Sequence, residues 1–244
     1  MHKDSTRLGI WSGPRNISTA LMRAWENRED CWVVDEPLYA HYLTQVHVAH
    51  PGVEEVIASQ ETDWRKVVAG LTGEIPHARA VYYQKHMAHH WLPHLRGDWV
   101  VGLTNAFLIR HPAEMLPSLA AKMGPPALRD TGLPQQVEIL RFVRERTGVL
   151  PLVFDSEDIL SDPRAALTRL CARIGVGFTE RMLHWPAGRR ETDGVWAKYW
   201  YDAVERSTGF EPWVPRARTV APELQPLLEE CMPYYEELAA YRGK

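Results

Sequence analysis

Five short apolar segments, each followed by a helical pattern, constrain the fold of this chain more than any other feature of its sequence. The segments span residues 7–12, 31–36, 79–85, 105–110 and 150–155. Strands that alternate with helices form parallel sheets, and the connecting helices cover both faces of such a sheet. The sequence therefore predicts an α/β fold, a three-layer sandwich in which helices flank a central parallel sheet.

Local signals between these segments indicate where several helices begin and end. We expect one helix at 18–27, directly after the first segment, and another from Pro112. Asp162 is a favourable N-cap residue for a helix that starts at Pro163, where the missing N–H costs nothing. Two further prolines lie inside helical patterns and are expected to kink or end them, namely Pro117 and Pro233.

No repeat and no long Gly-, Ser- or Pro-rich linker divides the 244 residues. We therefore expect a single domain over residues 1–244, with a helical and irregular C-terminal part from about residue 179. The clearest helical patterns in that part are 196–204 and 222–232. Four of its residues recur at helical spacing, which predicts a buried stripe: Trp196, Tyr199, Trp200 and Ala203.

Charge and cysteine usage narrow the class of protein. The net charge is −3, whereas a nucleic-acid binder usually shows a strong basic excess. Cys31, Cys171 and Cys231 are odd in number, far apart and without metal-type spacing, so reduced thiols are expected. The first ten residues hold no apolar stretch typical of a signal peptide, and no window is long enough to cross a bilayer. We expect a soluble cytoplasmic protein with no nucleic-acid or membrane partner.

The turn after the first apolar segment, "SGPRNIST", is a candidate anion site. At the carboxyl end of a strand, turn amides and the first turn of the next helix lack internal partners and attract phosphate or sulfate. Ser18 and Thr19 add hydroxyl donors, and Arg15 adds a permanently charged planar donor. The alternative is an ordinary turn with a surface arginine. A Walker A loop is absent, which disfavours an ATPase or GTPase.

A second strand-to-helix junction, "FLIRHPAEMLPSL", has the same character. Arg110 lies at the end of the expected strand, and Ser118 lies eight positions later on the helix. These two side chains could hold one phosphate between them. The alternative is a salt bridge at the helix start together with a solvated serine.

Together the two stretches resemble motifs of the sulfotransferase family. "PRNIST" is similar to that family's 5′-phosphosulfate loop, and "RHPAEMLPS" is similar to its 3′-phosphate motif. The segments "VFDSEDILSDP" and "LTRLCARIGV" resemble a third stretch of the family. "GRRETDGVWAK" loosely resembles its basic nucleotide-closing loop, and "DEPLY" resembles a segment that faces the acceptor. The resemblance covers about residues 7–178 and is weaker beyond.

This resemblance implies a P-loop NTPase-like fold and a defined reaction. The donor would be 3′-phosphoadenosine 5′-phosphosulfate (PAPS), and a sulfonate group would pass, without a metal, to a hydroxyl or amine of a small-molecule acceptor. Arg15 would contact the oxygen that bridges phosphate and sulfate. The resemblance also implies a donor-binding set in three parts: the loop Pro14, Arg15, Asn16, Ile17, Ser18 and Thr19; the pair Arg110 and Ser118; and the later residues Arg189, Arg190 and Gly194.

Two positions in the loop depart from the family pattern. Ile17 occupies the usual glycine position, and a β-branched side chain resists positive φ and close backbone approach. We therefore expect a loop of different shape and altered or weak donor binding. Arg15 replaces the more common lysine and can act only as a fixed cation, since it does not lose its proton.

A base is needed to remove the acceptor proton, and the stretch "YYQKHMAHHWLPH" supplies histidines for it. His86 is the first candidate, His89 and His90 are the second, and Glu36 is the third. The alternative is that these histidines lie on a polar helix face without a role. His86, His90 and His94 also share helical spacing that could bind zinc, but Pro93 and the lack of a matching carboxylate disfavour a metal site.

Two other functions fit the same sequence. One is a P-loop-type small-molecule kinase, which the missing Walker lysine disfavours. The other is a non-catalytic nucleotide-binding protein on the same fold, which the Ile17 departure favours. The sequence indicates neither the acceptor nor an oligomeric state.

Overall fold

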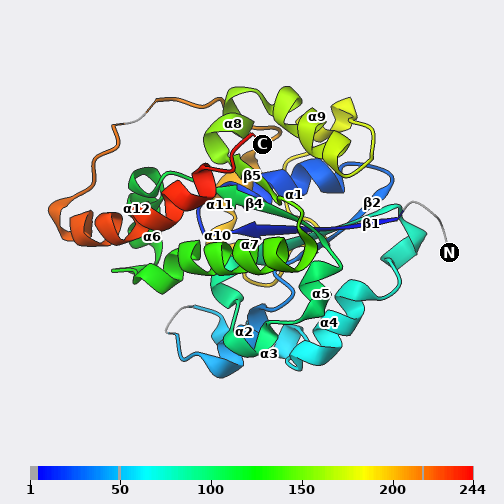
Figure 1. Cartoon of the computed structure of the whole chain (residues 1–244), viewed down its shortest axis with the longest axis horizontal. Coiled ribbons are helices and arrows are strands. Elements are labelled where there is room, and N and C mark those ends of the chain that lie inside the picture. The colour runs from blue at the N-terminus through cyan, green and yellow to red at the C-terminus, as the bar shows by residue number, and fades with distance from the viewer. Residues whose placement is uncertain (1–4, 49–50, 216, 244) are drawn as a thin grey trace.

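A five-stranded parallel sheet forms the centre of the molecule in the computed structural model, which describes residues 5–48, 51–215 and 217–243 (Figure 1). The strand order is β2-β3-β1-β4-β5, and every neighbouring pair is parallel. Each apolar segment identified in the sequence forms one strand, which confirms the predicted fold class. The strands are β1 (Thr6–Ser12), β2 (Cys31–Asp35), β3 (Val81–Met87), β4 (Thr104–Ile109) and β5 (Leu152–Asp155).

Helices cover both faces of this sheet, as Figure 1 shows for α1 on one side and α7 on the other. The α-helices of the first half are α1 (Ser18–Glu26), α2 (Tyr39–Gln45), α3 (Val53–Ser59), α4 (Trp64–Thr72), α5 (Asp98–Val101) and α6 (Pro112–Met123). Those of the second half are α7 (Leu133–Thr147), α8 (Ser156–Ser161), α9 (Pro163–Arg173), α10 (Ala197–Trp200), α11 (Asp202–Arg206) and α12 (Gln225–Ala239). Short 3₁₀ helices lie at Pro76–Ala78, Ala88–His90, Pro93–Leu95, Leu128–Thr131, Glu180–Leu183 and Pro222–Leu224.

Alternation along β1 assigns its side chains to two cores. Leu8 and Ile10 pack with α1 and α9 in one core, whereas Trp11 packs with α6, α7 and α12 in the other. Successive side chains of a strand point to opposite faces, so an apolar strand of this kind must be covered on both sides. This two-sided burial explains why the strand segments read as nearly continuous apolar runs.

The strand order also locates the place where a ligand can bind. The chain leaves β1 and adds β3 on one side of it and β4 on the other. In open parallel sheets the connections that leave such neighbouring strands run to opposite sides, and a crevice remains between them at the carboxyl ends. The loops after β1, β3 and β4 therefore surround one crevice at this edge of the sheet.

Helix starts follow the sequence signals closely. The Asp162 carboxylate accepts a hydrogen bond from the Ala165 amide at 2.9 Å, which confirms the predicted cap of α9. Pro117 and Pro233 lie inside α6 and α12, and both helices continue past them, so neither proline ends its helix. An interior proline removes one helix hydrogen bond, and in α6 burial of the neighbouring Leu116 and Leu119 offsets that loss.

The predicted stripe in the C-terminal part is wrong in its detail. The pattern 196–204 splits into α10 and α11, with Tyr201 between them. Trp196 and Tyr201 are buried, whereas Ala203 is exposed. The break at Tyr201 changes the helical register, so residues with one spacing no longer share one face. None of the described helices has the length and the hydropathy to cross a bilayer.

Candidate active site

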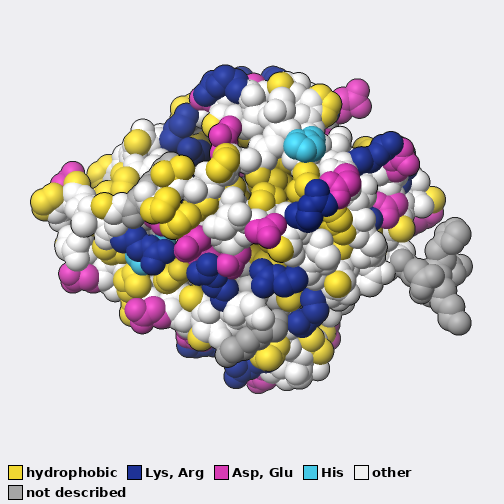
Figure 2. Space-filling model, turned by 90° about the horizontal axis from the view of Figure 1, so that it is seen from above, with side chains coloured by type: hydrophobic (Ala, Val, Ile, Leu, Met, Phe, Trp, Pro, Cys, Tyr) yellow, Lys and Arg dark blue, Asp and Glu magenta, His cyan; other side chains and the backbone are white. Residues whose placement is uncertain are grey.

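One cavity of about 560 Å³ lies at the carboxyl ends of the strands, and it is lined by both of the phosphate-type stretches identified in the sequence. Residues 14–19 form one wall, and Arg110, Glu114 and Ser118 form the adjacent wall. The opposite end is lined by Glu36, Tyr39, Tyr42, Lys85, Met87, His89 and Asp130. The C-terminal segment from Trp200 to Val214 contributes a largely apolar wall. On the face seen in Figure 2, basic and acidic side chains are interspersed with hydrophobic ones.

The loop between β1 and α1 is a tight turn with two residues in the left-handed region. Arg15 has φ 62° and Ile17 has φ 60°. Ile17 thus adopts the positive φ that its β-branched side chain disfavours. Each such residue costs about 1–2 kcal/mol relative to an ordinary conformation. Two contacts hold the turn in place. The side-chain amide of Asn16 donates to the Leu108 carbonyl, and the Arg110 guanidinium donates to the Arg15 carbonyl at 3.0 Å.

The N-terminus of α1 opens toward the cavity without a side-chain cap. Ile17 occupies the N-cap position and cannot accept a hydrogen bond, and the first turn of α1 holds no acidic residue. The first amides of a helix have no intrahelical partner and carry partial positive charge. Ser18 and Thr19 line the cavity at this point. The arrangement suits an anion.

Arg15 and Arg110 bring two positive charges to adjoining walls of the cavity. The Arg15 Nε atom donates to Ser118 Oγ at 2.9 Å, and Arg110 Nε lies 3.4 Å from a Glu114 oxygen. Burial, and next the charge of Arg110, lower the pKa of Arg15 from its ordinary value. Two like charges therefore lie close together in a partly desolvated site. A bound anion would relieve their repulsion.

The other end of the cavity holds a buried cluster of two carboxylates and one ammonium group. Lys85 Nζ donates to Asp35 at 2.7 Å, to Glu36 at 2.6 Å and to the Tyr201 hydroxyl at 2.9 Å. Burial raises the pKa of Glu36 to about 7, against the opposing effect of Lys85. The pKa of Lys85 lies well above its ordinary value because the nearby carboxylates outweigh its burial. Glu36 can therefore exchange a proton near neutral pH.

Comparisons with known proteins agree with this geometry. A family model described as "Sulfotransferase domain" matches residues 6–242. The chain belongs to the sulfotransferase family. Two curated Arabidopsis thaliana relatives, branched-chain-amino-acid aminotransferase-like proteins 2 and 1, are 33% and 35% identical over 231 residues, which is 95% of this chain. The chain spans only 41% of the length of each of these relatives.

Solved sulfotransferase structures share the fold. The sulfotransferase domain from the curacin biosynthetic pathway superposes with a TM-score of 0.54 at 13% identity, over 93% of this chain and 98% of that one. A sulfotransferase from Alicyclobacillus acidocaldarius gives 0.53 at 14% identity, over 98% and 97%. At such low identity these matches show the architecture.

The structure contradicts His86 as the first candidate for the base. This side chain is fully buried and stacks on Trp11, with ring centroids 4.3 Å apart. Lys85 and Met87 line the cavity, so the intervening residue of β3 must point to the opposite side of the sheet. Burial also lowers the pKa of His86 to about 3. Because successive side chains of a strand point to opposite faces, His86 faces away from the cavity that its neighbours Lys85 and Met87 line.

Of the remaining base candidates, Glu36 and His89 line the cavity. His90 is buried and stacks on Tyr39, with its Nε2 atom 4.0 Å from Glu36 Oε2. It therefore lies behind the carboxylate.

The zinc alternative is also contradicted. Residues 86–94 do not form a helix, because β3 runs to Met87 and short 3₁₀ turns follow. His94 instead lies beside His41, with 2.7 Å between their Nε2 atoms. Within the described residues, no group of three or more His, Cys, Asp or Glu side chains could hold a metal ion.

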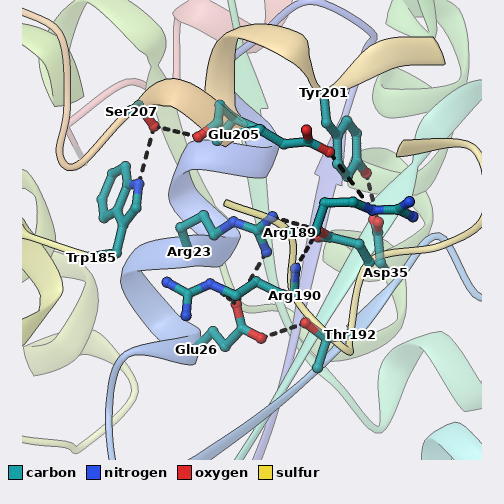
Figure 3. A network of polar contacts seen from close by, with 12 residues as sticks. Arg23, Glu26, Asp35, Trp185, Arg189, Arg190, Thr192, Tyr201, Glu205 and Ser207 are labelled. Atoms are coloured by element: carbon teal, nitrogen blue, oxygen red, sulfur yellow. Dashed lines mark hydrogen bonds and ion pairs between the residues drawn. The ribbon is translucent and has the colours of Figure 1, made fainter. Parts of the chain in front are cut away.

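Arg189, Arg190 and Gly194 do not line the cavity, contrary to their assignment to the donor site. Arg190 lies 3.9 Å from Glu26, and Arg189 lies 3.8 Å from Glu205. Figure 3 shows this network beside α1, where Thr192 donates to Glu26. Its centre is Arg23, which is buried and contacts the fully buried Asp193 carboxylate at 2.7 Å.

That buried ion pair explains the placement of the whole loop. Arg23 cannot be buried at low cost without a carboxylate, so Asp193 and its neighbours are drawn onto α1. Gly194 is needed there for packing, because a Cβ atom would lie 2.2 Å from the Trp196 ring. Asp193 is 170 residues from Arg23 in sequence, so a local sequence pattern cannot predict this contact.

Asp35, Lys85 and Tyr201 are site residues that the candidate set omitted. A signal for two of them exists in the sequence, since "DE" ends one predicted strand and a lysine ends another. In the sheet, Asp35 and Lys85 are register partners on adjacent strands. Only the strand order, which the sequence does not show, makes them neighbours.

Proposed function

We propose that this chain catalyses PAPS-dependent transfer of a sulfonate group to a hydroxyl or amine of a small-molecule acceptor. The observation that carries the proposal is the arrangement of one cavity. Arg15, Arg110, Ser118 and the uncapped start of α1 line one side, and the Glu36 carboxylate lines the other. Family membership supports sulfotransferase chemistry in general. The cationic side supports PAPS as the donor, and the Glu36 carboxylate on the other side supports an acceptor bound there.

The cationic side would hold the donor. The turn amides and the hydroxyls of Ser18 and Thr19 would contact the 5′-phosphate, and Arg110 with Ser118 would contact the 3′-phosphate. PAPS supplies an electrophilic sulfonyl group on a phosphate leaving group. Negative charge then develops at the bridging oxygen, where a preorganised cation stabilises the transition state most effectively. Arg15 would provide that charge.

The carboxylate side would activate the acceptor. Glu36 lies at the cavity surface, and its pKa of about 7 gives a mixture of acid and base forms at neutral pH. In the deprotonated form it would accept the proton of an acceptor hydroxyl or amine as the oxygen–sulfur or nitrogen–sulfur bond forms. His89, which also lines the cavity, is the second candidate.

Thermal shift with nucleotides tests the donor assignment. Adenosine 3′,5′-bisphosphate should raise the melting temperature in a concentration-dependent way, because it binds the folded state alone. A response to ATP with magnesium instead would favour a small-molecule kinase. No response to either nucleotide would favour a non-catalytic protein of this fold.

We also propose a cytoplasmic location and the absence of nucleic-acid and membrane partners. The three cysteines are free and buried, which fits a reducing compartment.

A further inference from the structure

The Lys85 ammonium group at the acceptor end of the cavity has no donor to spare. It carries three N–H donors, and three acceptors surround it: Asp35 Oδ1 at 2.7 Å, Glu36 Oε1 at 2.6 Å and the Tyr201 oxygen at 2.9 Å. The side chains of Lys85 and Asp35 are each only 1% exposed. A cation held on three sides in this way has one position, and it acts as a fixed charge.

The Tyr201 hydroxyl forms hydrogen bonds with both Asp35 and Lys85. It donates to Asp35 Oδ2 at 2.6 Å, as Figure 3 shows. It also accepts hydrogen bonds from Lys85 and from the Trp196 indole at 3.2 Å. Both Asp35 oxygens therefore accept a short hydrogen bond, one from Lys85 and one from Tyr201. Asp35 is thus the carboxylate of the cluster that is bound from two sides.

Glu36 shares its one counterion, Lys85, with Asp35. The cluster contains one ammonium group and two carboxylates, so one negative charge is in excess in a buried place. Its side chain is 11% exposed and reaches the cavity, whereas Asp35 lies behind it. Such a cluster takes up a proton at its most weakly held carboxylate. That group is Glu36, the one that faces the acceptor.

We propose that Asp35, Lys85 and Tyr201 form a positioning network that sets the protonation of Glu36, so that Tyr201 makes the C-terminal segment part of the catalytic machinery. The proposal rests on the proposed function for its catalytic meaning, while the network itself rests on the contacts above. Tyr201 lies between α10 and α11, 165 residues after Glu36. The distant segment thus completes a site that the sheet alone leaves unfinished.

The backbone aims the Glu36 carboxylate as well. Glu36 has φ 44°, in the left-handed region, and its amide donates to the Lys85 carbonyl at 2.9 Å. The Gln60 side chain donates to the Glu36 carbonyl at 3.2 Å. A strained residue held by contacts on both sides is typical of a preorganised functional group.

The charged and titratable groups that face Glu36 act in opposite directions. Burial raises the pKa of Glu36 most strongly and Asp35 raises it further, whereas Lys85 and the Tyr201 hydroxyl lower it. His90 faces the second carboxylate oxygen at 4.0 Å, and Tyr39 lies beside His90. Removing single members of the network should therefore move the titration of Glu36 up or down according to which member is lost.

The test is an NMR titration of the protein labelled with carboxyl-¹³C glutamate, with the Glu36 signal assigned by its loss in Glu36→Gln. Tyr201→Phe should raise the midpoint by roughly half a pH unit, less than the loss of a direct hydrogen bond to a charged group, because the Tyr201 proton goes to Asp35 and the hydroxyl acts on Glu36 through the network. Asp35→Asn should lower it. Unchanged midpoints, or shifts of both variants in the same direction, would overturn the proposal. Tyr201→Phe is nearly isosteric and decides the question alone if Asp35→Asn does not fold.

An activity readout separates this proposal from the proposed function. In the pH profile of kcat, Tyr201→Phe should move the acidic limb to higher pH by the same amount and leave the KM of the donor unchanged. Failure of nucleotide binding in the thermal-shift experiment would remove the proposed reaction but not the NMR shifts. Normal nucleotide binding with no NMR shift would remove the network and leave the reaction.

Discussion

The Nε atom of Arg15 donates a hydrogen bond to the Oγ atom of Ser118 at 2.9 Å, although 103 positions separate the two residues. This contact joins the turn after β1 to the helix after β4. The two stretches that separately resemble a 5′-phosphosulfate loop and a 3′-phosphate motif therefore form one continuous wall. The proposed donor, a nucleotide with phosphates at both ends of its ribose, matches a wall of that kind.

Replacing Arg110 should distinguish nucleotides by their 3′-phosphate. Arg110→Ala removes a charged donor, which should weaken binding of adenosine 3′,5′-bisphosphate by about 10- to 100-fold. Binding of 5′-AMP should change much less. Isothermal titration with both nucleotides measures the difference, and Arg141→Ala, an exposed arginine paired with Glu237 on the surface, is the matched control. Equal losses for the two nucleotides would place the 3′-phosphate elsewhere.

Replacing Arg190 should leave nucleotide affinity almost unchanged. Arg190→Ala alters a side chain that lies beside Glu26 outside the cavity, so the dissociation constant should stay within about two-fold of the wild-type value. The same titration as for Arg110→Ala measures it. A loss comparable to that of Arg110→Ala would show that this loop moves onto the nucleotide when it binds.

Two substitutions of Ile17 separate packing from backbone strain. Ile17→Ala and Ile17→Gly both remove the side chain that packs against the core, but only glycine adopts positive φ without cost. The glycine variant should therefore be more stable than the alanine variant by about 1 kcal/mol. Urea unfolding of the two proteins gives the comparison. An alanine variant of equal or greater stability would mean that the turn relaxes once the isoleucine is gone.

Substitution of Glu36 should remove turnover and spare donor binding. Glu36→Gln should lower kcat by about 10²- to 10⁴-fold, the usual contribution of a positioned base. In the wild type, kcat should rise with pH and level off above about 7, because the deprotonated carboxylate is the active form and burial raises its pKa to about 7. His89→Gln is the matched control from the same cavity end. If it, and not Glu36→Gln, stops turnover, the histidine is the base.

The sequence shows the fold well because the determinants of the fold are local. The apolar runs and the Asp162 cap each lie within a few residues, and the five strands and that cap form as predicted. The site is harder to predict from the sequence, because it depends on contacts between segments that are far apart in the chain. Lys85 meets Tyr201 across 116 positions, and Arg23 meets Asp193 across 170.

Side-chain direction is the other limit of sequence reasoning. A helix over residues 86–94 would have placed several histidines on one face, but a strand to Met87 alternates its side chains instead. Because side chains alternate along the strand, Lys85 enters the cavity and the next residue, His86, does not. The paired carboxylates at 35–36 were visible in the sequence, yet their common partner became apparent only with the strand order.

Burial of His86 should make the protein sensitive to mild acid. Burial lowers the pKa of this imidazole to about 3, below its unfolded value of about 6.5. The unfolded chain therefore binds a proton that the folded chain refuses, and stability is present above pH 6.5 and lost as pH falls below it. Between pH 7 and pH 5 this one group should cost on the order of 2 kcal/mol of the free energy of unfolding.

His86→Phe isolates that contribution, because phenylalanine can keep the stacking on Trp11 but cannot be protonated. Urea unfolding of both proteins at pH 7 and pH 5 gives the change in free energy of unfolding for each. The wild type should lose more stability than the variant over this interval, since every other titrating group is common to both. Equal losses would show that His86 accepts its proton in the folded state, and that it is open to water.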